Sequence, residues 1–188
     1  EKLAAVSPLK MAKYQASLGY IERTVGHPFS QYHWFDEVPL SVKGEESLLG
    51  KLYLGALPVI SRKDYQLNIW WDLMEKNVNA VLGLVEPYEL QCGQEDASAS
   101  LSPVPLVMWE NSQVEYKLLP APDFEPVPFD IIREGVSFLH RRLHAGRNVY
   151  IHCKAGRGRS VTIVVAYLMQ YHQLSYEEAY LKVLRARR

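Results

Sequence analysis

The stretch VYIHCKAGRGRSVTIVV, residues 149–165, predicts a strand, a loop and a helix in direct succession. Val149 to His152 is a short β-branched run typical of a buried strand, and the chain from Ser160 to Tyr171 is almost uniformly apolar, as in a helix buried on most sides. The seven residues between them include one cysteine, two glycines and three cations. Ligands of α/β sheets bind at the carboxyl ends of strands. We therefore expect a functional site in this loop.

The rest of the chain alternates between strand patterns and helix patterns. Short apolar runs predict strands at 34–38, 52–54, 80–85 and 115–119, and apolar residues at helical spacing predict helices at 65–77, 132–143 and 176–184. One helix is expected to end at Gly146, and the last begins with a capping box at Ser175 to Glu178. This alternation predicts the α/β class, with a mostly parallel central sheet flanked by helices.

The length of 188 residues fits one domain, or one domain with an extension. Residues 8–23 have weak helical character and are followed by a Gly-His-Pro break at 26–28, so we expect residues 1–30 to form an N-terminal helical extension packed on the domain. Residues 31–188 then form the domain proper, with a surface insertion at about 91–113, where sustained periodicity is lost. Because the chain starts without methionine and stops inside a helical pattern, we expect it to be part of a longer protein.

The composition excludes several classes of partner. Lys plus Arg and Asp plus Glu are both 21, so no global field attracts nucleic acid, and we expect no nucleic-acid partner. The two cysteines, Cys92 and Cys153, are too few for a disulfide framework and lack metal-ligand spacing, which indicates a reducing, intracellular compartment. The longest apolar run, Val161 to Met169, is far shorter than the ~20 residues that span a bilayer.

The loop after Cys153 has the composition of a phosphate cradle. Its glycines allow backbone N–H groups to turn inward at a helix N-terminus, where the free N–H groups and the helix dipole favour an anion. The planar guanidinium of Arg159 can bind two phosphoryl oxygens at once. Two further cations are expected at the rim. The expected phosphate-binding residues are Lys154, Ala155, Gly156, Arg157, Gly158 and Arg159.

Cys153 stands at the first position of this cradle, in the same positive potential. We expect its pKa to fall below the free value of about 8.5, which makes it a thiolate nucleophile at neutral pH. The Ser160 hydroxyl can hydrogen-bond the sulfur and ease its departure from phosphocysteine. The reaction that fits is phosphoryl transfer to cysteine followed by hydrolysis, with no metal or other cofactor. The C-x5-R spacing alone is a weak signal, but the Walker motif of nucleotide-binding loops is absent.

The motif HCKAGRGRS, residues 152–160, resembles the signature loop of cysteine-dependent protein tyrosine phosphatases, specifically the dual-specificity branch. Within that branch, LYLGALP (52–58), VLGLVEPYEL (81–90) and TIVVAYLMQ (162–170) resemble the mitochondrial-type phosphatases that act on phosphatidylglycerophosphate or phosphoinositides. The resemblance covers residues 34–188. It implies a phosphoric monoester hydrolase with the dual-specificity phosphatase fold.

The resemblance also implies a general acid. An aspartate on a mobile loop before the cysteine protonates the leaving group in this family, and Asp123 lies at the matching place, between a predicted strand and a helix. Glu125 and Asp130 are the rival carboxylates. We expect Glu125 to lie in solvent and Asp130 to cap the helix that follows.

Two supporting residues are expected around the cradle. Glu86 is either an exposed carboxylate at a strand end or, as the resemblance implies, a brace for Arg159 and the loop. His152 is expected to order the loop by hydrogen bonding. The segment 34–38, which matches a W-x-D-x-V pattern, is interpreted as structural.

The cations Lys154 and Arg157 make the cradle more basic than one phosphate requires, which suits a substrate with several negative charges. An anionic phospholipid head group is favoured, and the alternatives are a phosphoprotein substrate or a non-catalytic, phosphate-binding adaptor. Further cations form either a membrane-facing patch, which would give peripheral membrane contact, or solvated helix ends: Arg141, Arg142, Arg147, Arg185, Arg187 and Arg188. We expect a monomer, and the resemblance suggests the mitochondrion.

Overall fold

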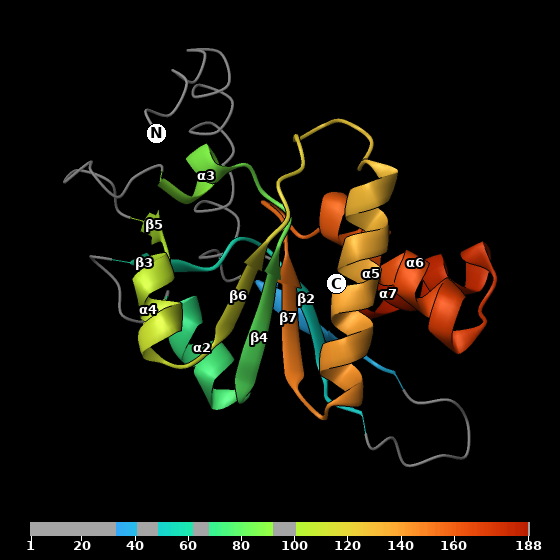
Figure 1. Cartoon of the computed structure of the whole chain (residues 1–188), viewed down its shortest axis with the longest axis horizontal. Helices are drawn as coiled ribbons and strands as arrows, with labels where there is room; N and C mark the ends of the chain where they lie inside the picture. The colour runs from blue at the N-terminus through green and yellow to red at the C-terminus, as the bar shows by residue number, and fades with distance from the viewer. Residues whose placement is uncertain (1–32, 41–48, 62–67, 92–100, 188) are drawn as a thin grey trace. The chain divides into compact units, whose positions relative to one another are not determined.

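The computed structural model describes residues 33–40, 49–61, 68–91 and 101–187, the parts drawn in colour in Figure 1. The contacts of the chain divide it into two units, residues 1–32 and 33–188, and every described residue belongs to the second. The expected helical extension over residues 1–30 lies outside the described residues, as does Cys92. The extension and its packing therefore stay a prediction.

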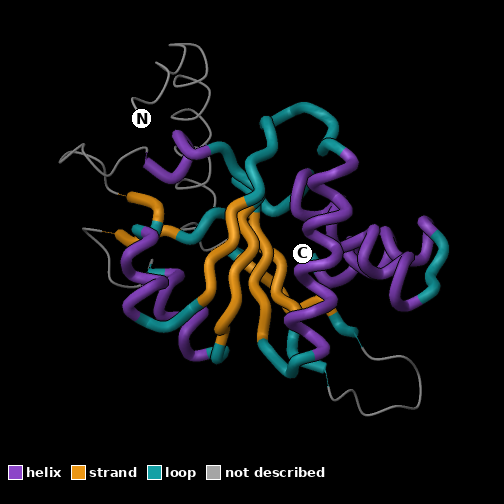
Figure 2. The backbone as a smooth tube through the Cα atoms, in the orientation of Figure 1, coloured by secondary structure: helices purple, strands orange, loops and turns teal. Residues whose placement is uncertain are grey.

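The central sheet contains five strands: β1 (Phe35–Val38), β2 (Leu52–Gly55), β4 (Val78–Gly83), β6 (Glu115–Leu118) and β7 (Asn148–His152). Their order across the sheet is β1-β2-β7-β4-β6 (Figures 1 and 2). The three pairings of β2 with β7, β7 with β4 and β4 with β6 are parallel, and β1 pairs antiparallel with β2 at the edge. The predicted mostly parallel sheet is confirmed.

Three long helices pack on one side of this sheet: α5 (Phe129–His144), α6 (Arg159–His172) and α7 (Tyr176–Ala186) (Figure 1). The main core lies between them and the strands, where Leu82 and Ile151 of the sheet belong to one buried cluster with Leu139 and Ile163. The apolar run of α6 reflects its place among α5, α7 and β2. The capping box at the start of α7 is present as predicted.

The other side of the sheet carries the short helices α2 (Ile69–Glu75), α3 (Pro87–Gln91) and α4 (Leu106–Asn111), and a two-stranded antiparallel sheet of β3 (Val59–Ser61) and β5 (Leu101–Pro103). The part of 91–113 that is described is more regular than the insertion expected there. Trp109 is 1% exposed, and its ring lies 6.0 Å from that of Tyr116. Elements this short show no sustained periodicity in a sequence. Within the described parts of the chain, no helix is long and apolar enough to cross a membrane.

Two glycines let the central strands close tightly around the end of β7. His152, the last residue of β7, is in register with Gly55 of β2 and Gly83 of β4. A Cβ on Gly83 would lie 2.5 Å from the Tyr116 hydroxyl, and one on Gly55 would lie 2.5 Å from the Cβ of Phe35. Side chains at either glycine would therefore push the strands apart where the cysteine loop begins.

Candidate active site

The loop between β7 and α6 forms a tight turn that begins with Cys153. Gly156 has a φ of +67°, and a Cβ on it would lie 2.4 Å from the carbonyl carbon and oxygen of Gly55. This position therefore requires glycine for both its backbone conformation and its close approach to β2. The loop ends at Gly158, and α6 begins at Arg159. The free N–H groups of the first turn of α6 face the loop side of the helix, as an anion site requires.

The Cys153 sulfur lies at the base of this loop, with the residue only 3% exposed. The Ser160 hydroxyl donates a hydrogen bond to Sγ at 3.3 Å. Burial raises the pKa of the thiol, but the Ser160 hydrogen bond and the charge of Arg159 act in the opposite direction. Backbone N–H groups of Ser160 and Gly158 add to them, and the pKa of Cys153 falls below its ordinary value. The site thus favours a thiolate.

Arg159 connects the cradle to two other segments of the chain. Its side chain is 3% exposed and pairs with the fully buried carboxylate of Glu89, Nη1 to Oε2 at 2.8 Å and Nη2 to Oε1 at 3.2 Å. Nη1 also donates to the Ala121 carbonyl at 2.8 Å, and Nη2 lies 3.1 Å from Oδ1 of Asp123. Nε is buried and has no hydrogen-bond partner among the described residues. An unpaired buried N–H is costly, so an anion that accepts from Nε is expected here.

The carboxylate that braces Arg159 is Glu89, three residues after the Glu86 that the sequence suggested. Glu89 lies on the short helix α3, which turns its side chain into the core, and Oε2 also accepts the backbone N–H of Glu86 at 2.8 Å. Glu86 itself is half-buried and lies between β4 and α3, directly before Pro87. Both residues belong to the same VEPYEL segment. Glu89 is a supporting residue that the sequence analysis did not name, and a bracing role for Glu86 stays a prediction.

Asp123 lies on the loop between β6 and α5, and its side chain is 28% exposed. The next residue, Phe124, has a φ of +64°, is 87% exposed and donates its N–H to Oδ1 of Asp123 at 3.2 Å. Glu125 is exposed, as expected. Asp130 does not cap α5: the helix begins at Phe129 after Pro128, and Asp130 lies in its first turn, where its charge still complements the helix dipole.

His152 is fully buried behind the cradle and is held in one tautomer. Its Nδ1 lies 3.1 Å from the Cys153 carbonyl oxygen, which can only accept, so Nδ1 carries the proton. Nε2 then accepts from the Tyr116 hydroxyl at 2.8 Å. Burial, aided by the charge of Arg159, outweighs the hydrogen bond to Cys153 and lowers the pKa of His152 to about 3. A neutral His152 positions the loop backbone and carries no proton to the reaction.

The remaining loop residues occupy different environments. Lys154 is 6% exposed, so it does not lie at the rim where it was expected, and its carbonyl accepts the Leu57 N–H at 3.0 Å. This hydrogen bond ties the loop to the chain after β2. Ala155 is half-buried, Gly156 is buried, and Arg157 and Gly158 are exposed. Arg157 is thus the exposed cation at the mouth of the cradle.

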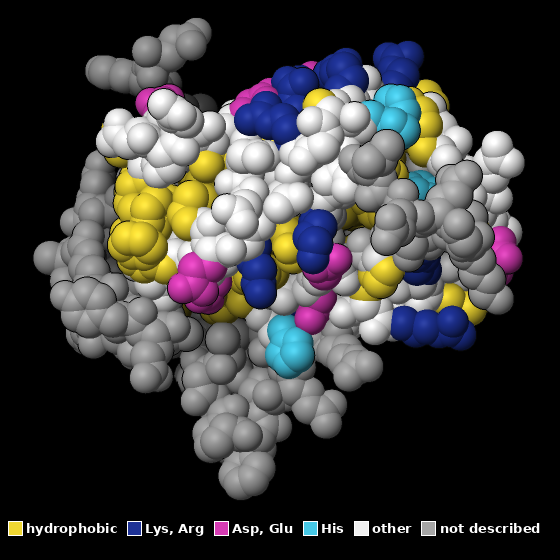
Figure 3. Space-filling view, turned by 90° about the horizontal axis from the view of Figure 1, so that it is seen from below, with side chains coloured by type: hydrophobic (Ala, Val, Ile, Leu, Met, Phe, Trp, Pro, Cys, Tyr) yellow, Lys and Arg dark blue, Asp and Glu magenta, His cyan; other side chains and the backbone are white. Residues whose placement is uncertain are grey.

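The expected basic patch is divided by ion pairs. Arg142 and Arg147 both bind the carboxylate of Glu115, and the side chain of Arg187 is 6% exposed and pairs with Asp36 at 2.7 Å. Figure 3 shows basic and acidic side chains interspersed on the face turned toward the viewer. Arg187 instead supports the site, because its Nε donates to the Gly156 carbonyl at 3.4 Å.

Comparison with known proteins identifies the class of phosphatase to which this fold and this loop belong. Residues 88–188 match the family described as "Dual specificity phosphatase, catalytic domain", which is more than half of the chain, and the chain belongs to this family. The resemblance inferred from HCKAGRGRS is therefore confirmed.

Similar proteins within this family include phosphatidylglycerophosphate phosphatases. The chain is 32% identical to phosphatidylglycerophosphate phosphatase PTPMT1 of Arabidopsis thaliana over 152 residues, which are 80% of this chain and 36% of that protein. It is 36% identical to the Homo sapiens protein phosphatidylglycerophosphatase and protein-tyrosine phosphatase 1 over 129 residues, 67% of this chain and 56% of that protein. The crystal structure of PTPMT1 in complex with PI(5)P superposes with a TM-score of 0.62 at 27% identity, covering 82% of this chain and 84% of that chain. The chain thus spans only 36% and 56% of the lengths of these two curated relatives.

Proposed function

We propose that this chain is a cysteine-dependent phosphatase that hydrolyses phosphate monoesters through a phosphocysteine intermediate. The observation that carries the proposal is the Cys153 sulfur, buried in a tight loop before α6 with its pKa lowered by Ser160 and by Arg159. The unpartnered Nε of Arg159 supports an oxyanion as the ligand of this loop.

In the first step, the phosphate of the substrate binds the loop N–H groups and Arg159, and the Cys153 thiolate attacks phosphorus. The sulfur–phosphorus bond forms while the bond from phosphorus to the leaving oxygen breaks. The leaving oxygen takes a proton from the carboxyl group of Asp123, because an alkoxide is otherwise a poor leaving group. The bound phosphate competes with Asp123 for Nη2 of Arg159, which frees the carboxyl group to reach the leaving oxygen.

In the second step, a water molecule attacks the phosphorus of the phosphocysteine. Asp123, now a carboxylate, accepts a proton from this water, and the sulfur–phosphorus bond breaks to release inorganic phosphate. The sulfur leaves as a thiolate, and the hydrogen bond from Ser160 at 3.3 Å stabilises its charge. No redox partner is needed, because each step exchanges one bond to phosphorus for another.

The test is phosphate release from aryl phosphates by the purified chain. We expect Cys153→Ser to abolish turnover and to retain phosphate binding. Asp123→Asn should lower turnover by roughly 10²-fold for a poor leaving group and by less for a good one. If the unmodified chain binds phosphate but releases none, it is a phosphate-binding adaptor. Equal losses for both leaving groups in Asp123→Asn would assign the acid to another residue.

For the substrate, we propose an anionic phospholipid head group. Two observations support it: both curated relatives above carry phosphatidylglycerophosphate phosphatase activity in their names, and the similar crystal structure holds PI(5)P. The exposed Arg157 can pair with a second negative charge of the same head group. The name of the human relative also includes protein-tyrosine phosphatase, so phosphoprotein is the second candidate.

A panel of phosphatidylglycerophosphate, phosphoinositides and phosphotyrosine peptides separates the two substrates. Faster turnover of the peptides would overturn the lipid proposal. We also propose that the protein acts as a monomer in peripheral contact with a membrane and in a reducing compartment, because a thiolate nucleophile is readily oxidised. Sedimentation with and without anionic vesicles tests the first two points, and inactivation by peroxide tests the third.

A further inference from the structure

A groove of about 330 Å³ runs along α6 and α7 and begins at the cradle. Arg157 and Gly158 of the loop line one end of it. From there it follows one face of α6, past Val161, Val165 and Met169, which recur every fourth residue. The eight residue steps from Val161 to Met169 extend roughly 12 Å along the helix. The groove therefore extends from the loop at residues 157–158 along α6.

The groove is lined by apolar and aromatic side chains. Tyr176 and Tyr180 of α7 are 55% and 42% exposed, and their rings stack with centroids 5.9 Å apart. Met169 is 41% exposed. The only charged side chain of the lining is Arg157, at the cradle end. A ligand that fits this pattern has an anionic end in the cradle and an uncharged, apolar remainder.

On the basis of the proposed function, we infer that this groove holds an acyl chain of the phospholipid whose phosphate lies in the cradle. The groove shares two lining residues, Arg157 and Gly158, with the loop of the candidate active site. The hydroxyl of Thr162, the other polar group on this face of α6, donates to the Gly158 carbonyl at 3.3 Å. The lining therefore contains few polar groups that a ligand would have to satisfy with hydrogen bonds.

An extended phosphopeptide fits the groove less well. Its backbone N–H and C=O groups would lose water and need partners, which an open strand edge supplies. The walls here are two helices, whose backbone groups are already bonded within each helix. An acyl chain carries no such groups, and its burial in the groove removes only apolar surface from water.

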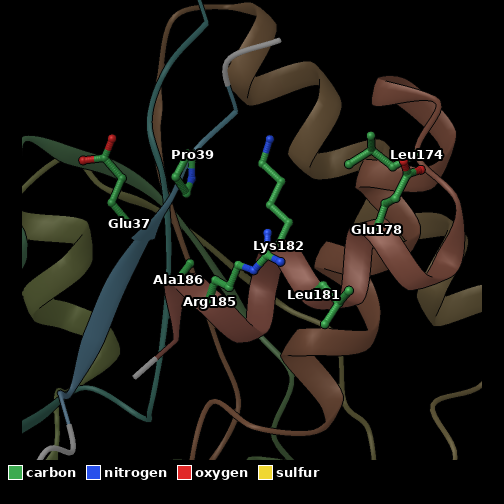
Figure 4. A pocket seen from close by; sticks show the side chains of 8 residues that line it. All are labelled: Glu37, Pro39, Leu174, Glu178, Leu181, Lys182, Arg185 and Ala186. Carbon is green, nitrogen blue, oxygen red and sulfur yellow. The ribbon is translucent and has the colours of Figure 1, made fainter. Parts of the chain in front are cut away.

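A second and larger groove, of about 560 Å³, provides the comparison (Figure 4). It lies on the other side of α7, and no cradle residue lines it. Its lining includes two acids, Glu37 and Glu178, and two bases, Lys182 and Arg185. Leu181 lines this groove and is 44% exposed, close to the value for Met169. Substitution of Leu181 is thus a matched control for substitution of Met169.

The test uses one phosphorylated head group with two acyl chains that lengthen from butanoyl to octanoyl, all below their aggregation concentrations. Each kcat/KM is divided by the rate of the same protein variant with an aryl phosphate. We expect the ratio to rise up to about fourfold for each methylene that enters the groove, and then to level off. Met169→Glu and Tyr180→Glu should flatten this rise, and Leu181→Glu should leave it unchanged.

Binding to Cys153→Ser, measured by calorimetry, gives the same chain-length series without turnover. A rise in affinity with chain length that Met169→Glu abolishes would support the groove even if no phosphatase activity is found. The inference is overturned if chain length has no effect, if Leu181→Glu flattens the rise as strongly as Met169→Glu, or if only phosphopeptide binding responds to Met169→Glu. Absence of aryl phosphate turnover, in contrast, counts against the proposed phosphatase activity alone.

Discussion

Substitution of Glu89 by Gln isolates the buried ion pair that holds Arg159. The Glu89 side chain is 0% and the Arg159 side chain 3% exposed, so solvent screens little of their attraction. Removal of one partner from a buried pair leaves an uncompensated charge and costs about 3–5 kcal/mol. Asp123, at 3.1 Å from Nη2, still offsets part of that charge. We therefore expect a loss near the lower limit, about 3 kcal/mol.

Urea denaturation followed by circular dichroism measures this loss. With an m value of about 2 kcal/mol/M, a loss of about 3 kcal/mol lowers the midpoint by about 1.5 M. Inorganic phosphate should raise the stability of Glu89→Gln more than that of the unmodified chain, because the bound anion replaces the negative charge of the missing Glu89 carboxylate beside Arg159.

The matched control is Glu115→Gln. Glu115 also pairs with two arginines, but its side chain is 33% exposed and theirs are 29% and 32% exposed. Exposed pairs contribute about 0–1 kcal/mol, so this variant should lose much less stability than Glu89→Gln. The double variant Glu89→Gln/Arg159→Met should be more stable than Glu89→Gln, since it removes the buried charge. Equal losses for Glu89→Gln and Glu115→Gln, or a less stable double variant, would refute the reasoning.

Three further predictions concern residues of the cradle. The pKa of His152 is about 3 in the folded protein and about 6.5 in the unfolded chain. Between these pH values the unfolded chain binds one more proton than the folded protein. The free energy of unfolding therefore falls by about 1.4 kcal/mol for each pH unit by which the pH is lowered. His152→Asn should remove this part of the pH dependence in acid denaturation, and identical slopes would contradict it. Ser160→Ala should raise the pKa of Cys153, because Ser160 supplies the strongest lowering effect; an unchanged pH profile of iodoacetamide alkylation would disprove this. Gly156→Ala should abolish phosphate binding and destabilise the fold more than the control Gly146→Ala. Gly146 has a φ of +73° but free space around a Cβ, so its substitution should cost only about 1–2 kcal/mol. Equal thermal shifts for the two variants would show that the cradle tolerates a side chain at 156.

The sequence predicts the elements of this fold and the chemistry of the loop because both depend on neighbouring residues. Cys153, Arg159 and Ser160 lie within eight residues, between a strand and a helix with strong patterns of their own. The loop geometry follows from local constraints, chiefly the glycine at 156, where a Cβ would meet the Gly55 backbone. The capping box at Ser175 is also local, and it is present as predicted.

Contacts between distant segments could not be predicted in the same way. The contact of Glu89 with Arg159 depends on which side of a five-residue helix turns inward, and a helix that short shows no periodicity. The sequence left Arg187 either in a membrane-facing patch or at a solvated helix end. The carboxylate that it pairs with, Asp36, lies 151 residues earlier. In each case the position of the side chain depends on a contact between segments that are far apart in the sequence.

The two carboxylates on Arg159 differ in how easily a substrate can replace them. Glu89 has no exposed surface and makes two hydrogen bonds to the guanidinium, so it stays paired and fixes the orientation of Arg159. Asp123 is 28% exposed, lies on a loop and contacts Arg159 through one oxygen at 3.1 Å, a contact that the dianion of a phosphate monoester can displace. The phosphate of a substrate can therefore take the place of Asp123 on Nη2, while Glu89 keeps the guanidinium in position. Glu89 is thus the carboxylate that holds Arg159 in place for a phosphate, and Asp123 is the one that can leave Arg159 and reach the leaving oxygen in the proposed mechanism.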